Sequence, residues 1–365
     1  MLLDTVSPMP HLARVPPYAA AEKPAGDGGR PVILSQNELA TAPSPRAVEA
    51  AAATLAGSNR YPDSDCEALC AAIAARHGLR ADRVLCTPGS MTLLGTLVRS
   101  YAGAGDEVVI TRHGYGYFRT VIQLAGATPV VAPETELHAD VDAILARVTE
   151  RTRIVLLANP NNPTGTMIPW SEVLRLHAGL REDILLVLDA AYAEFVARPD
   201  FRAGSDLVDA SRNTVMIRTF SKIYGLAGMR VGWGYFPAAI ADLLRRVTPP
   251  SSVSSQAQAA AIAALADRDH TRATFEAVSR ERQRLAAALG VLGLAGPPSE
   301  ANFVLADFGS PERAKRAHAF LTRRGIHLRP VASADLPQHL RITIGTAAEH
   351  EEVLGALRAF LDRPA

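Results

Sequence analysis

The sequence lacks an excess of charge of either sign. It has 38 basic and 37 acidic residues among 365, a formal net charge of +1, and the basic residues are spread along the chain. Nucleic-acid stripes and membrane-binding faces are built from clustered basic residues, so this distribution argues against both partners. No apolar run approaches the length of a membrane span, and residues 1–8 lack the basic and apolar regions of a signal peptide. We therefore expect a cytoplasmic protein.

Cysteine is scarce as well. The chain has only Cys66, Cys70 and Cys86, and the first two are spaced i, i+4 within a helical pattern that Asp65 is expected to cap and that runs to His77. A metal site needs more ligands nearby, and His77 is the one candidate. We therefore expect no metal ion and interpret the cysteines as buried thiols in a reducing compartment.

Lysine is the third shortage, with only Lys23, Lys222 and Lys315. Lys23 lies in a Pro/Gly segment and Lys315 in a helical charge cluster, whereas Lys222 follows the apolar run 215–217 and precedes a glycine-rich turn. Burial there would favour the neutral amine, which can attack a carbonyl and form a Schiff base, a reaction closed to the permanently protonated guanidinium of arginine. The alternative is a loop lysine that points to water.

The chain is too long for one small core, so we expect more than one domain. Residues 1–30 are rich in Pro, Ala and Gly and indicate an N-terminal arm. The alternation of strands and helices then predicts a large domain over 31–250, and a change of pattern after residue 250 predicts a small domain over 251–365.

Short apolar runs alternate with helical stretches in the large domain. Strands are predicted at 84–86, 108–110, 128–131, 154–157, 184–188, 215–217 and 231–235, and helices at 49–56, 65–77, 115–124, 141–148 and 170–178. Continuous apolar strands separated by helices are typical of an α/β fold with a mainly parallel sheet covered on both faces. The C-terminal part predicts a smaller α+β unit with helical segments at 255–289 (broken near residue 267), 311–323 and 347–361, and strands at 303–305, 326–328 and 340–344.

Polar motifs follow the predicted strands of the large domain. Asn162 lies in the run 159–165, Asp189 ends a strand with Tyr192 three residues on, and Ser221 precedes Lys222. Ligands of open α/β sheets bind outside the carboxyl ends of the strands, where these motifs are expected to meet. A tight turn at 159–165 and a capping or ion-paired carboxylate at Asp189 are the structural alternatives.

Taken together, the motifs resemble those of a known enzyme class. Asn162-Pro163-Thr164-Gly165, Asp189-Ala190-Ala191-Tyr192, and Ser221-Lys222 with Arg230 eight residues later are similar to the motifs of fold type I aminotransferases that use pyridoxal phosphate, most closely the histidinol-phosphate aminotransferase family. The resemblance covers roughly residue 34 to the C-terminus. It implies transamination between histidinol phosphate, as the amino donor of L-histidine biosynthesis, and 2-oxoglutarate, in a homodimer with shared active sites.

The resemblance also implies a role for each matching residue. Lys222 forms the Schiff base with the cofactor and moves the proton, while Asp189 pairs with the pyridinium nitrogen. Asn162 and Tyr192 bind the phenolic oxygen, and Tyr115 stacks on the ring unless it is a core aromatic. The cofactor phosphate is bound by backbone amides at Ser90 and Met91, by Ser221 and Arg230, and by Tyr61 of the neighbouring subunit, whose alternative is a plain turn tyrosine.

Four further residues are implied in substrate binding. Arg341 matches the arginine for the anionic end of the substrate, Arg329 a second one associated with a substrate phosphate, and Tyr18 an arm tyrosine that closes over the substrate. Asn37 belongs to a pocket segment that departs from the family pattern. A surface ion pair is the ordinary alternative for either arginine.

Three departures leave the substrate open. The segment 36–40 lacks the usual second Asn-Pro, Met91 and Thr92 replace the two acids of the usual Gly-Ser-Asp-Glu, and the stretch 114–120 places Tyr117 and Arg119 near the ring. The alternatives are an aminotransferase for an aromatic or other amino acid in a secondary pathway and a pyridoxal-phosphate decarboxylase. A cofactor-binding regulatory domain is a third, but it usually carries a DNA-binding module that this sequence does not show.

Overall fold

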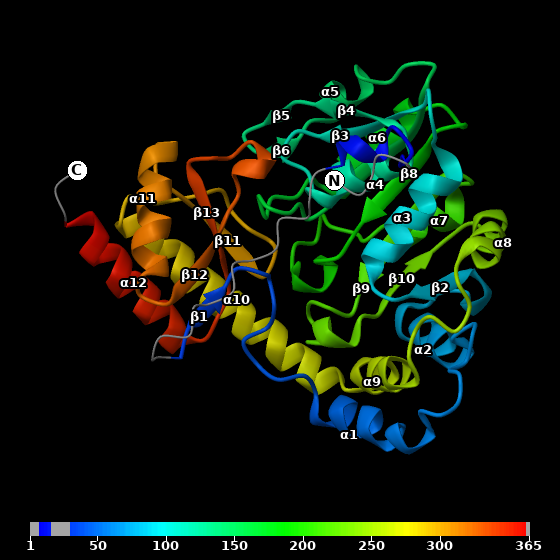
Figure 1. Cartoon of the computed structure of the whole chain (residues 1–365), viewed down its shortest axis with the longest axis horizontal. Helices are drawn as coiled ribbons and strands as arrows, with labels where there is room; N and C mark the ends of the chain where they lie inside the picture. Colours follow the sequence, from blue (N-terminus) through cyan, green and yellow to red (C-terminus); the bar gives the residue numbers. More distant parts are fainter. Residues whose placement is uncertain (1–6, 16–29, 363–365) are drawn as a thin grey trace.

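The computed structural model describes residues 7–15 and 30–362. A seven-stranded sheet of order β2-β10-β9-β8-β7-β3-β4 organises the larger unit (Figure 1). Only β10 runs antiparallel to its neighbours, so the sheet is mainly parallel, as predicted. Its strands are β2 (Val84–Thr87), β3 (Glu107–Thr111), β4 (Thr128–Ala132), β7 (Thr152–Ala158), β8 (Leu185–Asp189), β9 (Thr214–Thr219) and β10 (Gly232–Tyr235).

Helices cover both faces of this sheet because its central strands are apolar on both sides. Every residue of β8 and β9 is buried. One face packs against α3 (Ser90–Tyr101), α4 (Tyr117–Leu124) and α8 (Ala238–Val247), and the other against α5 (Val141–Leu145), α6 (Trp170–Gly179) and α7 (Ser205–Ala210). A small hairpin of β5 (Glu134–Thr135) and β6 (His138–Ala139) follows β4.

The second unit is a four-stranded sheet with helices on one side. Its order is β1-β12-β13-β11, built from β1 (Val32–Leu34), β11 (Phe303–Asp307), β12 (Ile326–Pro330) and β13 (His339–Thr343). It packs with α11 (Pro311–Thr322) and α12 (Ala347–Leu361), while α10 (Arg268–Val291) reaches it from α9 (Ser255–Ala266) (Figure 1). This is the predicted smaller α+β unit, and the predicted break near residue 267 separates α9 from α10.

Several predicted boundaries differ from the structure. β1 lies within 31–250 but pairs in parallel with β12, so the smaller sheet recruits a strand from the segment assigned to the large domain. The helix expected at 49–56 is α1 (Pro45–Ala53), because Pro45 starts it at a position where proline needs no amide partner. Helices α7 and α8 were not predicted. Short 3-10 turns complete the structure: η1 (Leu12–Arg14), η2 (Leu55–Gly57), η3 (Ala81–Arg83), η4 (Ala193–Phe195), η5 (Ala227–Met229) and η6 (Ala332–Ala334).

The three cysteines are free and buried, as predicted. Cys66 adopts a left-handed backbone (φ 53°) just before α2 (Glu67–His77), and the sulfur atoms of Cys70 and Cys86 lie 3.9 Å apart. No helix in the described ranges combines the length and apolarity required to cross a membrane.

The start of α2 corrects one prediction. Asp65 was expected to cap this helix, but the side chain of Asp63 accepts from the amide of Glu67 at 2.7 Å and from that of Asp65 at 3.1 Å. The left-handed residue Cys66 turns the chain, so the acceptor that reaches the first helical amide comes from four residues upstream.

Replacement of this acceptor tests the assignment. Asp63→Ala should lower the free energy of unfolding by about 1 kcal/mol, the usual cost of losing a helix cap, measured by urea denaturation. The matched exposed variant Asp65→Ala should change it by less than about 0.5 kcal/mol. A larger loss in Asp65→Ala than in Asp63→Ala would restore the original prediction.

Candidate active site

A cavity of about 550 Å³ lies at the carboxyl ends of the large sheet and is closed on one side by β12 and β13. It brings together twelve of the fourteen predicted site residues: Asn37, Ser90, Met91, Tyr115, Asn162, Asp189, Tyr192, Ser221, Lys222, Arg230, Arg329 and Arg341. Tyr61 does not line it and is 92% exposed on a turn, and Tyr18 lies outside the described residues.

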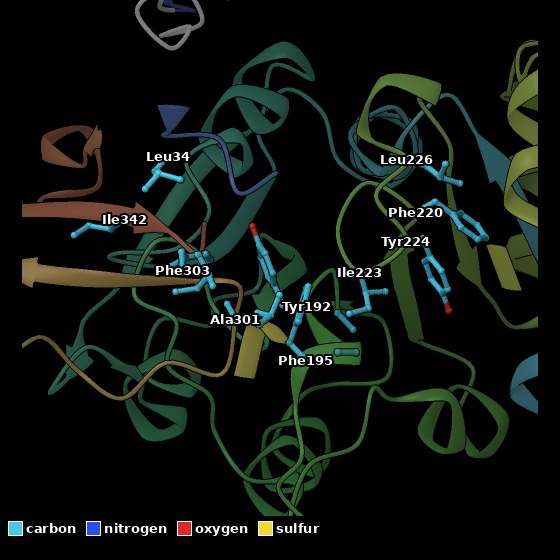
Figure 2. Close-up of a cluster of buried hydrophobic side chains, with 14 of the residues drawn as sticks. Leu34, Tyr192, Phe195, Phe220, Ile223, Tyr224, Leu226, Ala301, Phe303 and Ile342 are labelled. Carbon is cyan, nitrogen blue, oxygen red and sulfur yellow. The ribbon is translucent and has the colours of Figure 1, made fainter. Parts of the chain in front are cut away.

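Lys222 is placed by the loop that follows β9. Phe220, Ile223, Tyr224 and Leu226 are buried in the core shown in Figure 2 and anchor this loop, so Ser221 and Lys222 between them face the cavity. The loop is closed by hydrogen bonds from the Phe220 amide to the Val231 carbonyl (3.1 Å) and from the Leu226 amide to the Phe220 carbonyl (3.0 Å).

The Lys222 amine has weak partners and cationic neighbours. It donates to the carbonyl oxygens of Asn37 (3.1 Å) and Gln36 (3.3 Å), neither of which carries a charge. Burial lowers the pKa of Lys222 from its ordinary 10.5 to about 7, and the positive charge of Arg341 adds to this effect. The amine can therefore act as a nucleophile or base near neutral pH.

Burial shifts the pKa of Asp189 in the opposite direction to that of Lys222. Asp189 is the last residue of β8 and is buried, and burial raises its pKa from 3.8 to about 6. The amide of Ala191, which donates to Oδ1 at 3.1 Å, and the charge of Lys222 partly oppose this rise. A buried carboxylate of this kind is suited to a cationic partner such as a protonated ring nitrogen.

Asn37 connects the smaller sheet to the cavity. Its side-chain amide donates to the Tyr192 hydroxyl at 2.9 Å, and its own amide donates to Thr343 Oγ1 at 2.9 Å. Asn302 donates to the Asn37 carbonyl at 3.0 Å, the same oxygen that accepts from Lys222. Asn37 is buried with φ 56°, a left-handed conformation that asparagine tolerates better than most residues.

Tyr192, which accepts this hydrogen bond from Asn37, is held in place by its packing. Its ring packs edge-on against Phe303 with centroids 5.3 Å apart (Figure 2), and burial raises its pKa to about 12. The hydroxyl therefore keeps its proton at neutral pH and can donate to a ligand oxygen while it accepts from Asn37.

Arg341 lies across the cavity on β13, buried over the Phe303 ring at 5.2 Å. One guanidinium nitrogen donates to Asn162 Oδ1 at 2.6 Å and another to the Ser35 carbonyl at 2.7 Å. Because the Asn162 oxygen accepts from Arg341, the amide nitrogen of Asn162 is the group that can donate to a ligand.

A cradle for a phosphate forms where α3 begins. Arg230 donates to Ser221 Oγ at 3.4 Å, and a Cβ atom built on Gly89 would lie 2.3 Å from Arg230 Nη2. Gly89 also has φ 81°, so only glycine fits between the guanidinium and the helix. The amides of Ser90 and Met91 lie in the first turn of α3 and have no partner within the helix, which suits an anion.

Some functional contacts were not predicted from the sequence. Ser35, Asn302 and Thr343 position Asn37 and Arg341, but none stands in a recognisable motif. The wall from Pro330 to Ala334 was also missed. The one signal in the sequence that could have pointed to these contacts was the pattern of a buried strand directly after Asn302.

Comparison with known proteins agrees with this geometry. The family model for aminotransferase class I and II matches residues 30–357. A histidinol-phosphate aminotransferase of Rhodospirillum centenum is 48% identical over 355 residues, which cover 97% of this chain and 98% of the relative. One of Ruegeria pomeroyi is 46% identical, with 98% and 99% covered. This chain belongs to the histidinol-phosphate aminotransferase family.

A solved structure extends the comparison to the fold. The histidinol-phosphate aminotransferase of Sinorhizobium meliloti, crystallised with pyridoxal-5'-phosphate, superposes with a TM-score of 0.86 at 31% identity and 90% coverage of both chains. The enzyme is a pyridoxal-phosphate-dependent aminotransferase of fold type I. Its site fits the cofactor, since the cradle at Gly89 suits the phosphate, Asp189 the ring nitrogen and Lys222 the aldehyde.

The shortage of lysine makes the pKa of Lys222 measurable. In the cofactor-free protein labelled with ¹³C at lysine Cε, one of three lysine signals should titrate near pH 7, with the amine protonated below and neutral above that pH. The Lys222→Arg variant should lack that signal. Three signals that all titrate near 10.5 would contradict the burial of the amine.

Proposed function

We propose that the enzyme transfers the amino group of histidinol phosphate to 2-oxoglutarate in histidine biosynthesis. The observation that carries the proposal is the meeting of two predicted anion-binding arginines, Arg329 and Arg341, with Lys222 and Asp189 in one cavity. The names of the relatives at 43–48% identity over nearly the whole chain support the same substrate.

Lys222 is proposed as the catalytic residue. When bound, pyridoxal phosphate supplies an electron sink that stabilises negative charge at the substrate carbon. The Lys222 amine, neutral above pH 7, attaches the cofactor and later takes the proton from the substrate carbon and returns it. Its contacts to the carbonyls of Gln36 and Asn37 hold the amine at the carboxyl end of β9.

The remaining residues bind and orient the cofactor and the substrate. Asp189 faces the ring nitrogen, Tyr192 and Asn162 donate to the phenolic oxygen, and Tyr115 stacks on the ring. Ser90, Met91, Ser221 and Arg230 bind the cofactor phosphate, a proposal supported by the cradle at Gly89. Arg341 binds the anionic end shared by amino and oxo acids, Arg329 the substrate phosphate, Asn37 orders the pocket and Tyr18 closes it.

We further propose a cytoplasmic homodimer with shared active sites and the domain division 1–30, 31–250 and 251–365, with β1 as the segment of 31–250 that pairs into the smaller sheet. Tyr61 supports the dimer, because a tyrosine that is 92% exposed gains from burial against a partner. From that position it would reach the cofactor phosphate of the neighbouring subunit. Three free thiols fit a reducing compartment.

The amino donor can be identified by a half-reaction. Histidinol phosphate mixed with the holoenzyme should convert the absorbance of the bound cofactor from its aldehyde-derived to its amine form, because the cavity offers guanidinium groups to the phosphate of the molecule. A panel of aromatic and other amino acids should react far more slowly. Lys222→Ala should stay folded and convert none of them.

Other outcomes select the alternatives. Conversion by an aromatic or other amino acid, with histidinol phosphate inert, would assign the enzyme to a secondary pathway. Release of carbon dioxide without any need for an oxo acid would assign it to the decarboxylases. Turnover in Lys222→Ala would remove Lys222 from its role.

The shared site can be tested with mixed dimers. Tyr61→Phe should weaken cofactor binding roughly tenfold through the lost hydrogen bond to a charged phosphate, measured by fluorescence titration. When Tyr61→Phe and Lys222→Ala chains are co-expressed with different tags, the heterodimer should contain one site with both native residues and bind cofactor there with native affinity. A heterodimer whose active site stays weak would place Tyr61 in its own subunit's site.

A further inference from the structure

Among the described residues, Arg119 is the one cationic side chain of the cavity that the proposed function leaves without a role. Four arginines, whose charge is permanent, line the cavity: Arg119, Arg230, Arg329 and Arg341. The roles proposed above use three of them, so the guanidinium of Arg119 is available for an anion in the same space.

The bonding of Arg119 distinguishes it from its neighbours. Arg230 donates to Ser221 and the Ala227 carbonyl, and Arg341 to Asn162 and the Ser35 carbonyl. Arg119 is half-buried and makes no hydrogen bond or ion pair with any residue in 7–15 or 30–362. A partly desolvated guanidinium with no partner retains its full capacity to bind an anion from solution.

No acidic residue in the part of the chain that the structure describes forms an ion pair with Arg119. The first turns of α3 and α4, which carry Met91 and Arg119 into the cavity wall, contain no acidic residue. Asp189 accepts from the Ala191 amide at the end of β8, and Glu38 forms no ion pair within the described ranges. The guanidinium of Arg119 is therefore available to pair with an anionic ligand.

The helix of Arg119 adjoins the segment that carries Arg329. His113, in the loop that enters α4, shares a hydrogen bond with the Ala334 carbonyl at 2.6 Å, and Arg112 lies 3.6 Å from Asp335. Arg329 is the penultimate residue of β12, just before this same stretch, and Pro330, Ser333 and Ala334 line the cavity with it. From these two contacts we infer that Arg119 and Arg329 serve the same end of the cavity, one from each unit.

We propose that Arg119 is a specificity-determining residue that binds the terminal phosphate of the amino donor together with Arg329. Two guanidinium groups offer a phosphate dianion several charge-assisted hydrogen bonds in a forked geometry, more than a neutral or aromatic end can use. The inference rests on the proposed function for the identity of the donor, but the anion site stands on Arg119 itself.

A pair of substrates that differ only in the phosphate isolates this contact. In the holoenzyme, Arg119→Ala should raise the KM for histidinol phosphate about 10- to 100-fold, the usual effect of losing one charged hydrogen-bond pair, and leave kcat/KM for histidinol within about twofold. Arg119→Lys should recover part of the loss. Arg99→Ala, an exposed arginine of α3 outside the cavity, controls for the change in net charge.

Binding of ethyl phosphate to the holoenzyme, measured by calorimetry, separates this inference from the choice of donor. If the wild type does not turn over histidinol phosphate, the proposed function fails, but weaker binding of ethyl phosphate by Arg119→Ala than by Arg99→Ala still supports the anion site. Equal ethyl phosphate binding by both variants overturns it. Equal losses for histidinol phosphate and histidinol in Arg119→Ala also overturn it, because they show a structural effect.

Discussion

The contact between the Lys222 amine and the carbonyl of Asn37 is the constraint on which the site depends. It joins a loop at the end of the large sheet to a segment that the smaller sheet holds, since Asn302 and Thr343 bond to the same residue. A carbonyl partner satisfies the amine without adding a negative charge, and the charges of Glu38 and Asp189 offset the cost of protonation in the buried site only in part. Had a carboxylate stood there, the pKa of the lysine would have stayed high and its reactivity at neutral pH would have been lost.

Burial shifts the pKa values of two groups of the site in opposite directions. The pKa of Lys222 falls to about 7 and that of Asp189 rises to about 6, because each loses the water that would stabilise its charged form. The arginines differ, since a guanidinium stays charged and must be paired or solvated. The site therefore separates its tasks by residue type, with permanent cations for anions and a tunable amine for proton transfer.

The residues that follow strands could be predicted from the sequence, and those that join distant segments could not. Asn162, Asp189 and Lys222 stand at the ends of β7, β8 and β9, where local apolar runs reveal the strand and parallel pairing brings the ends together. The pairing of Val32 with Ile326 in β1 and β12 spans nearly the whole chain and leaves no local signal. The capping of α2 by Asp63 depends on the left-handed turn at Cys66, which propensity does not predict.

The charge balance of the cavity explains how the departures from the family pattern fit together. Acids at positions 91 and 92 would place negative charge in the first turn of α3, beside the amides proposed for the cofactor phosphate, whereas Met91 and Thr92 leave that turn neutral. The same neutral wall leaves Arg119 without an internal partner, so its charge is kept for the ligand. Without the two acids, and with Arg119 unpaired among the described residues, the cavity as a whole attracts anions more strongly. Selectivity among anions must then come from the position of each guanidinium group. Arg341 on β13 is fixed by its hydrogen bonds to Asn162 and to the Ser35 carbonyl, while Arg119 stands on α4, which follows His113 and its contact with Ala334. A carboxylate of an oxo acid and the phosphate of the amino donor can thus be bound by different guanidinium groups, so that their positions rather than their charge tell them apart.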